Sequence, residues 1–472
     1  MKVLLINPPT PSMIPNRDYY LPLSLLYLAS ALQNAGVDVN VLDLNVFRPE
    51  QHGDPTRFCE TIIAEKVSDY KPSLIGLGCL FSGQFKSIQS FSENIRRTFA
   101  DIPIVIGGLH PSIYAAEILT NCPYIDWVVV GEGEESTVEL VNTLKSGRRD
   151  LDKIDGFAYR TDGKVVVNPK KRFIPDPDKI AFPAYGLLNL SDYYRDTSDW
   201  NNPKGLSLKM SVPIVSSRSC PMRCNFCPAF MVMGPKWRSR SAKNVVDELE
   251  YLHKEYGQNH FSFMDDNLTF DRTRMLDICD EIAKRKLKIQ FETPNGIAVG
   301  TIDEEVLSLL MDAGMTRISL AIESGSDMIR NQVMGKRLSR EKILEVIGLT
   351  KKYKELYVIA FFVIGMPEDT LATLEETYQM VKDIDVNKPI ISNAMPFPGT
   401  KLYAQALRDS LFLDELDLNS LWKTTDIYSG ANNKRFFLKP YGLELSELQK
   451  FRGRIDTLVD EIIRVKSLSF KK

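Results

Sequence analysis

Three cysteines form the pattern in this sequence that is richest in chemistry. Cys220, Cys224 and Cys227 have the spacing C-x3-C-x2-C and closely follow the apolar run 212–215. Cysteine thiolates normally hold the irons of a [4Fe–4S] cluster, so a loop with three of them leaves one iron open to a small molecule. An open coordination position is typical of a reacting metal centre rather than a structural one. The spacing therefore predicts a [4Fe–4S] cluster with one accessible iron.

Two other interpretations of these cysteines remain open, namely a structural zinc site and buried free thiols. Zinc requires a fourth ligand nearby, and none of the 4 histidines lies close to the loop in the sequence. The other cysteines are expected to be small buried apolar side chains; they are Cys59, Cys79, Cys122 and Cys279. An odd total of 7 cysteines, with three in one loop, does not resemble a secreted disulfide framework. We therefore expect a cytoplasmic location.

The overall composition narrows the class of protein. A chain of 472 residues is expected to form two or three domains, and 44% apolar with 25% charged residues is typical of a soluble globular protein. A net charge of −2 gives no support for a nucleic-acid partner or an anionic membrane. We expect no transmembrane segment, because apolar runs of spanning length are absent. The N-terminal apolar run ends at Pro8 and is too short for a signal peptide.

Residues 1–145 alternate short apolar runs with segments of helical periodicity. The predicted strands are 3–6, 37–42, 74–77, 102–106 and 127–130, and the predicted helices are 23–35, 57–70, 85–99, 112–119 and 134–144. Apolar strands separated by single helices indicate a parallel sheet covered on both faces. The segment is therefore predicted to be a doubly wound, Rossmann-like α/β domain that binds its ligand at the carboxyl ends of the strands.

The loops at those strand ends are rich in glycine and proline; they are residues 7–12, 78–83, 107–110 and 131–134. Glycine allows the backbone to approach a ligand closely, although the same glycines could simply form tight turns. The first strand is not followed by G-x-G-x-x-G, which disfavours a dinucleotide.

The following segment, 146–205, is predicted to connect two domains and to pack on the surface. It contains a hairpin over 156–167 with Asp162-Gly163 at its turn, followed by a proline-rich stretch.

Residues 206–400 repeat the alternation of strand and helix with a longer period. Strands are predicted at 212–216, 260–264, 289–292, 317–321, 357–363 and 389–393, and helices at 242–256, 272–284, 304–313, 340–353 and 371–383. Six such units are two short of a closed barrel and predict a partial (β/α)6 barrel with its site at the carboxyl ends of the strands. The cysteine loop follows the first of these strands.

The C-terminal region, 401–472, is predicted to be mixed and mainly helical. Residues 443–466 are expected to form an amphipathic helix, and 412–441 are rich in aromatic residues. The region could cap the barrel or shape the substrate pocket.

With both halves placed, residues 1–400 resemble the radical S-adenosylmethionine superfamily, in the branch with an N-terminal cobalamin-binding domain. Phe226 completes the family signature C-x3-C-x-aromatic-C. The resemblance implies that the amino and carboxylate groups of S-adenosylmethionine chelate the open iron. One electron then cleaves the sulfonium bond and gives methionine and a 5′-deoxyadenosyl radical, a step assisted by proximity. Arg238 and Arg240 are candidates for the cofactor carboxylate, with surface pairing as the alternative.

The resemblance also implies contacts with S-adenosylmethionine on later strands. Asp265 or Asp266 would accept from the methionine ammonium, unless the two form a helix N-cap pair. Glu323 would bind the ribose hydroxyls, and Gly365 would let the backbone approach the adenosyl group. The segment around Met395 would lie by the adenine.

In the N-terminal domain, the resemblance implies that five residues after the third, fourth and fifth strands contact cobalamin: Ser82, Gly107, Gly108, Gly131 and Glu132. The motif D-x-H-x-x-G is absent, since residues 43–45 lack its histidine and follow the second strand. This implies cobalamin bound without a protein imidazole on cobalt. The alternative is a domain that has lost cobalamin and binds substrate or a partner. His110 is expected to pack or to contact the corrin edge.

The reaction that the resemblance implies is methyl transfer to an unactivated carbon of a small molecule or natural product. One S-adenosylmethionine methylates cobalamin, a second yields the radical that abstracts a substrate hydrogen, and the substrate radical takes the methyl group. The alternatives are ring formation, rearrangement or oxidation without methyl transfer, and an iron–sulfur protein without enzymatic activity. An external electron donor such as a flavodoxin or ferredoxin is expected. The sequence leaves open the substrate, the residues that act directly on it and the oligomeric state.

Overall fold

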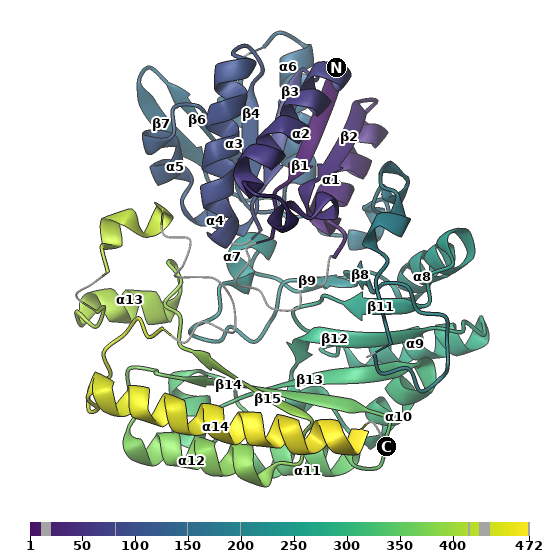
Figure 1. Ribbon diagram of the computed structural model, residues 1–472, viewed down its shortest axis with the longest axis vertical. Coiled ribbons are helices and arrows are strands. Elements are labelled where there is room, and N and C mark those ends of the chain that lie inside the picture. Colours follow the sequence, from purple (N-terminus) through teal and green to yellow (C-terminus); the bar gives the residue numbers. More distant parts are fainter. Residues whose placement is uncertain are drawn as a thin grey trace. The chain divides into compact units, whose positions relative to one another are not determined.

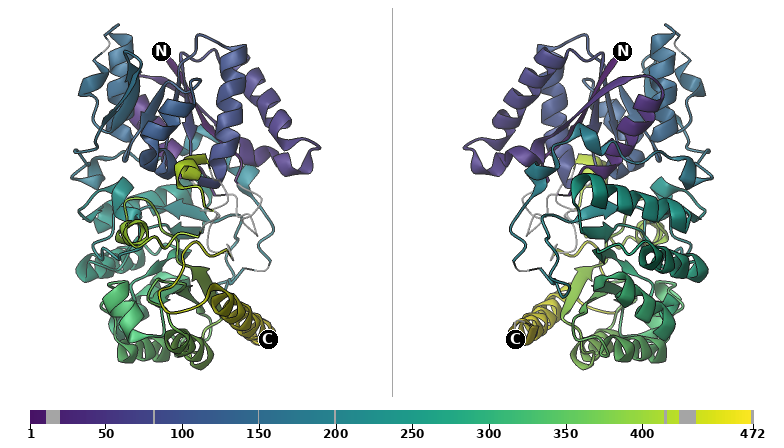
Figure 2. Two further views of the ribbon diagram at one scale, coloured as in Figure 1. Left: turned by 90° about the vertical axis from the view of Figure 1, so that its left-hand side faces the viewer. Right: turned by 90° about the vertical axis from the view of Figure 1, so that its right-hand side faces the viewer.

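The computed structural model describes residues 1–10, 20–80, 82–148, 150–198, 200–413, 416–423 and 435–470. The chain divides into two compact units (Figures 1 and 2). Unit 1 comprises Met1–Tyr194, Met231–Gly234 and Asp417–Gly430, and unit 2 comprises Arg195–Phe230, Pro235–Leu416 and Ala431–Lys472. Within the described residues, none of the helices is both long and apolar enough to cross a membrane.

Unit 1 is built on a seven-stranded sheet in the order β2-β1-β3-β4-β5-β6-β7. The first five positions in this order are parallel, with the strands β1 (Lys2–Asn7), β2 (Asp38–Asp43), β3 (Leu74–Gly78), β4 (Ile104–Gly107) and β5 (Trp127–Val129). The helices are α1 (Leu23–Asn34), α2 (Pro55–Tyr70), α3 (Phe85–Thr98), α4 (Leu109–Ile113), α5 (Ala115–Asn121) and α6 (Glu134–Lys145). The chain passes to opposite sides of β1, towards β2 and then β3, so the carboxyl ends of β1 and β3 are where ligands of this fold bind. The predicted doubly wound fold is confirmed.

Two details of unit 1 differ from the sequence-based expectation. The hairpin, β6 (Phe157–Thr161) and β7 (Lys164–Asn168), extends the sheet through antiparallel pairing with β5. It covers the backbone groups that β5 would otherwise expose at the sheet edge, and unit 1 continues to Tyr194. The single helix expected over 112–119 is instead α4 and α5, because Tyr114 between them has a non-helical backbone, with φ −115° and ψ 29°.

Unit 2 is built on a six-stranded, fully parallel sheet in the order β15-β14-β13-β12-β11-β8. The strands are β8 (Val212–Ile214), β11 (His260–Phe263), β12 (Gln290–Ile297), β13 (Met315–Glu323), β14 (Tyr357–Ile364) and β15 (Lys388–Asn393). The intervening helices are α8 (Ala242–Tyr256), α9 (Arg272–Lys284), α10 (Glu304–Ala313), α11 (Arg340–Thr350) and α12 (Leu371–Asp383). Sequential strands are neighbours, and the described residues show no pairing of β8 with β15. This is the open, partial barrel that the sequence predicts.

Short elements complete the first loop of the barrel. β9 (Ser217–Arg218) pairs antiparallel with β10 (Arg238–Ser239), and α7 (Ala229–Met233) follows the cysteine loop.

The C-terminal region divides between the two units. α13 (Lys401–Arg408) and the long α14 (Leu445–Phe470) belong to unit 2, where Arg452 donates to Asn393 Oδ1 at 2.6 Å and so fastens α14 to the edge strand β15. Residues 417–423 instead pack on unit 1. Of the predicted aromatic-rich segment 412–441, residues 414–415 and 424–434 lie outside the described residues.

Candidate active site

The cysteine loop lies at the carboxyl end of β8, between β9 and α7. All three cysteines are free thiols and partly exposed. Ser219 and Arg223 adopt left-handed backbone conformations, with φ 69° and 54°. Non-glycine residues hold such angles only where the surrounding structure fixes them, and these are common at functional sites.

Asn225 anchors this loop to two other parts of unit 2. Its N–H donates to the Met334 carbonyl at 3.0 Å, and its side-chain amide donates to the Val333 carbonyl at 2.6 Å. Its own carbonyl accepts from Leu402 N–H, at the start of α13, at 3.0 Å. The loop is therefore held by the segment after β13 and by α13.

The donor set of this loop fits a cluster better than a single ion. Among the described residues, histidine, cysteine and acidic side chains do not gather in threes as ligands of one metal ion. In a cubane each cysteine binds a different iron, so the three sulfurs need not converge on one point. Burial raises the pKa of each thiol, that of Cys227 to about 12. Binding to iron would deprotonate these thiols.

After β11, the two candidate carboxylates have different surroundings. Asp265 is buried and accepts three hydrogen bonds, from Ser216 N–H at 3.1 Å, Ser216 Oγ at 2.7 Å and Ser217 Oγ at 2.5 Å. These bonds hold the turn between β8 and β9. The alternative that the two aspartates cap a helix is wrong, because Asp271 is the N-cap of α9.

Asp266 is the carboxylate that remains available. Its side chain is exposed, yet the surrounding protein limits its hydration, and this effect together with the charge of Asp265 raises its pKa to about 6. A carboxylate in such a place is stabilised by a cationic ligand. Of the two predicted alternatives for the methionine ammonium, the structure thus favours Asp266.

Glu323 ends β13 with a left-handed φ of 73° and is ion-paired with Lys336 at 2.8 Å. Burial alone would lower the pKa of Lys336, but the negative charge of Glu323 raises it overall. Lys336 was not identified from the sequence. It lies in the irregular turn after the π-helix η9 (Met328–Val333), where no periodic pattern marks a functional side chain.

Gly365 also has a positive φ, 84°, and a Cβ there would lie 3.0 Å from the Phe436 ring. Its N–H donates to Asp369 at 2.8 Å. Burial raises the pKa of Asp369 to about 6, although Thr373 opposes this by donating to it. The turn therefore requires glycine, and Phe436 occupies the space beside it. Asp369 was not identified from the sequence.

The other predicted contacts of unit 2 differ in availability. Phe226 and Met395 are both half-buried. Arg240 is buried, pairs with Glu248 and donates to the Val215 carbonyl at 3.0 Å. Arg240 thus braces β8 and is not a surface pair.

In unit 1, the predicted glycines hold the loops of neighbouring strands together. At Gly108, with φ 119°, a Cβ would lie 2.3 Å from the Cys79 carbonyl oxygen. Gly131 has φ 76°, and Gly107 is the last residue of β4. Glu132 is buried and accepts from Ile174 N–H at 3.0 Å, which fastens the chain beyond the hairpin.

Ser82 is buried and hydrogen-bonded to His110, with 2.9 Å between Oγ and Nδ1. His110 Nε2 lies 3.1 Å from the Trp422 carbonyl, and burial lowers the pKa of His110 to about 4. The ring is therefore neutral, with its proton on Nε2 because only that nitrogen faces a carbonyl, and Ser82 donates to Nδ1. Both ring nitrogens are engaged, so His110 is not available to cobalt.

A buried carboxyl group, Asp43, occupies the carboxyl end of β2, where the histidine motif is missing. It accepts from Asn7 Nδ2 at 2.9 Å, Asn45 Nδ2 at 2.8 Å and Tyr193 Oη at 2.7 Å. Burial raises its pKa, and these donors oppose the rise. Asp43 thus fixes the first and second loops of the sheet.

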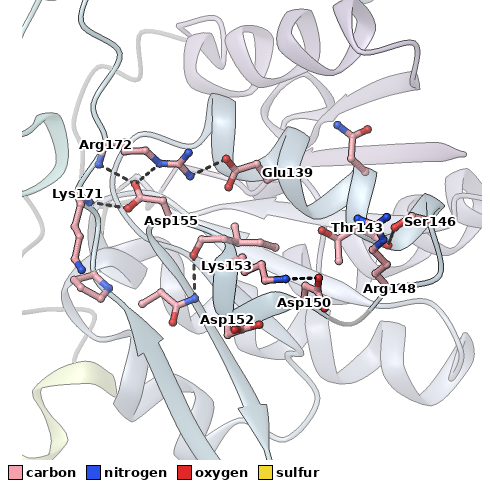
Figure 3. Close-up of a pocket in the computed structure, with 14 residues that line it drawn as sticks. Glu139, Thr143, Ser146, Arg148, Asp150, Asp152, Lys153, Asp155, Lys171 and Arg172 are labelled. Atoms are coloured by element: carbon pink, nitrogen blue, oxygen red, sulfur yellow. Dashed lines mark hydrogen bonds and ion pairs between the residues drawn. The ribbon is translucent and has the colours of Figure 1, made fainter.

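An open pocket of about 770 Å³ also lies in unit 1, between α6 and residues 150–155 and 168–172 (Figure 3). Several of its charges pair with one another, for example Arg172 with Glu139 at 2.7 Å and Lys153 with Asp150 at 2.8 Å. None of the predicted cofactor contacts lines it.

Comparison with known proteins agrees with this arrangement. Residues 214–381 match the family model of the radical SAM superfamily, and residues 17–141 match that of the B12 binding domain. The chain is 31% identical over 417 residues to an uncharacterised methyltransferase of Pyrococcus horikoshii, covering 88% of this chain and 84% of the relative. It is 28% identical over 388 residues to the anaerobic magnesium-protoporphyrin IX monomethyl ester cyclase of Rubrivivax gelatinosus, covering 81% and 66%.

Among solved structures, the radical S-adenosylmethionine methyltransferase TsrM of Kitasatospora setae, with cobalamin and a [4Fe–4S] cluster bound, superposes with a TM-score of 0.69. The two share 18% identity, and the match covers 100% of both chains. At this identity the likeness concerns the fold.

The fold, the cysteine loop and the two family models define a radical S-adenosylmethionine enzyme with a cobalamin-binding domain. The chain belongs to this cobalamin-binding branch of the radical SAM superfamily, and its cofactors are a [4Fe–4S] cluster, S-adenosylmethionine and cobalamin.

Proposed function

We propose that this enzyme transfers a methyl group to an unactivated carbon of a small-molecule substrate. The observation that carries the proposal is the anchored loop of three free cysteines at the carboxyl end of a partial barrel, in a chain that also matches the B12 binding domain. The similarity to the Pyrococcus methyltransferase over 88% of the chain supports methyl transfer as the reaction.

In unit 2, Cys220, Cys224 and Cys227 would hold the cluster, which supplies the electron that cleaves S-adenosylmethionine when both are bound. Asp266 would accept from the methionine ammonium, because its carboxylate is accessible and its charge is poorly hydrated. Glu323 would orient the ribose hydroxyls from its strained position at the end of β13. The Phe226, Gly365 and Met395 contacts remain predictions of the sequence pattern.

In unit 1, cobalamin would lie at the carboxyl ends of the parallel strands and supply the methyl carrier. Gly107, Gly108 and Gly131 lie at these strand ends, where Gly108 lets two loops pack closely, while Ser82 and Glu132 hold the loops around them. His110 is not available as a ligand to cobalt, because its ring is neutral and both of its nitrogens are hydrogen-bonded.

A second candidate is oxidation or ring formation with the same cofactors and no methyl transfer. The 28% identity to the Rubrivivax cyclase favours it. In either case one-electron reduction of the cluster requires an external donor, for which a flavodoxin or ferredoxin is suited.

The experiment uses the full chain purified without oxygen, with cluster and cobalamin reconstituted, and S-adenosylmethionine carrying an isotopically labelled methyl group. The enzyme is incubated with a reductant and cell extract, and products are searched by mass spectrometry. Labelled methyl in a product, together with 5′-deoxyadenosine and S-adenosylhomocysteine, is the expected result. A product that forms with 5′-deoxyadenosine but without the labelled methyl would replace methyl transfer by the second candidate. The Cys224→Ala variant is the control for non-enzymatic labelling.

A further inference from the structure

Lys336 is a largely buried cation in the segment that holds the cysteine loop. Its side chain is 11% exposed, as is that of its partner Glu323. The same turn accepts both hydrogen bonds of Asn225, through the carbonyls of Val333 and Met334. Lys336 therefore belongs to the segment on which the cysteine loop is mounted.

Arg330 fixes this segment in place. Its side chain is fully buried and donates to the Ser324 carbonyl at 2.6 Å and to the Leu338 carbonyl at 2.7 Å. Ser324 follows Glu323, and Leu338 lies two residues beyond Lys336. One guanidinium therefore fixes the backbone close to both members of the ion pair. The Lys336 N–H also donates to the Arg330 carbonyl at 3.0 Å. The backbone that carries Lys336 is therefore fixed, and the ion pair with Glu323 holds its ammonium.

The segment that carries Lys336 contacts the cysteine loop. Gly335 precedes Lys336, and a Cβ at Gly335 would lie 3.9 Å from Oδ1 of Asn225, the residue that follows Cys224. Lys336 thus places a positive charge, paired with Glu323, in the segment that contacts the loop. Because the pair is largely buried, solvent and salt screen its charges only weakly.

We propose that Lys336 is a positioning residue that raises the reduction potential of the cluster held by Cys220, Cys224 and Cys227, with Glu323 limiting the size of this effect. The inference rests on the proposed cluster site. The potential of an iron–sulfur cluster depends on the net charge and hydrogen bonds around it. One added electron makes the cluster more negative, and a nearby cation stabilises that state more than the oxidised one.

The test is an anaerobic redox titration of the reconstituted full chain, followed by electron paramagnetic resonance, without S-adenosylmethionine. At the potential where the wild-type cluster is half reduced, Lys336→Gln should lower the ratio of reduced to oxidised cluster about tenfold, which corresponds to about 59 mV for one electron. Lys336→Arg keeps the charge and should restore the ratio. The matched control is Lys352→Gln, which removes an exposed lysine paired with Glu304 in the same unit and should leave the ratio unchanged.

Glu323→Gln is an independent test. Removing this anion should raise the ratio of reduced to oxidised cluster, the opposite of the change expected for Lys336→Gln. This variant decides the test if Lys336→Gln fails to assemble a cluster. Iron and sulfide contents equal to wild type, with ratios unchanged in both variants, would overturn this inference alone. A wild-type chain that assembles no cluster would overturn the proposed function and this inference with it.

Discussion

The two ligand-binding edges of this enzyme are organised in different ways. At the carboxyl ends of the unit 1 strands, several polar side chains are already engaged: Ser82 with His110, Glu132 with Ile174, and Asp43 with donors from three residues. At the carboxyl ends of the unit 2 strands, three thiols are free and Asp266 is exposed.

This difference matches what each ligand needs from the protein. A large preformed cofactor such as cobalamin requires a fixed backbone surface, which satisfied hydrogen bonds and close loop packing supply. A cluster and S-adenosylmethionine require ligands and charges that are still available. Unit 1 thus provides a fixed backbone surface, and unit 2 provides thiols and a carboxylate that are still available to bind ligands.

The largest expected effect is the loss of the cluster in unit 2 without a loss of stability. Cys224→Ala should remove the absorption near ~400 nm that thiolate-ligated clusters show and all cleavage of S-adenosylmethionine. Thermal unfolding should change little, because the side chain lies partly exposed in a loop. Absorption spectra and 5′-deoxyadenosine formation measure the result, with Cys279→Ala, a buried cysteine outside the loop, as control. Full cleavage by Cys224→Ala would disprove the cluster assignment.

Gly108→Ala should show the opposite pattern, a loss of stability in unit 1 with the cluster intact. A Cβ would lie 2.3 Å from the Cys79 carbonyl oxygen, at a φ of 119°. Overpacking and backbone strain together should cost about 2–4 kcal/mol of unfolding free energy, measured by denaturant titration. Gly163 also has a positive φ, 72°, but open space around it, so Gly163→Ala should cost about 1 kcal/mol. Equal losses in the two variants would contradict the packing role of Gly108.

Asp369 tests how the buried turn around Gly365 contributes to the stability of unit 2. Burial raises its folded-state pKa to about 6, above the value of 3.8 that applies to the unfolded chain. The folded state therefore binds this proton more tightly, so the stability it contributes is present below pH 3.8 and is lost as pH rises through 6. The free energy of unfolding should fall by about 3 kcal/mol across this window. The fall should disappear in Asp369→Asn. The free energy of unfolding of both proteins is measured by denaturant titration from pH 4 to 7, and an equal fall in the two would contradict this role of Asp369.

The smallest effect concerns the free carboxylate. Asp266→Asn should weaken binding of S-adenosylmethionine about tenfold. The substitution removes the negative charge that strengthens the hydrogen bond to the ammonium, a loss of about 1.5 kcal/mol of binding free energy. Equilibrium binding to the reconstituted enzyme measures this, and cluster content should stay at the wild-type level. The same affinity in Asp266→Asn as in wild type would return Asp265 to consideration.

The sequence by itself determined the elements and the chemistry of the cluster loop. Apolar runs separated by helix-period segments predicted both sheets, because strand and helix burial leave local patterns. The spacing of Cys220, Cys224 and Cys227 predicted the cluster because all three ligands come from one short loop.

Only the tertiary structure decided which other groups act together. Asp265 and Asp266 are adjacent in sequence, yet hydrogen bonds from the β8–β9 turn occupy one and leave the other free. Lys336 meets Glu323 through a turn that buried Arg330 holds in place, and the hairpin joins the sheet because β5 has an open edge. Such pairings depend on burial and on contacts between distant segments, which leave no periodic trace along the chain.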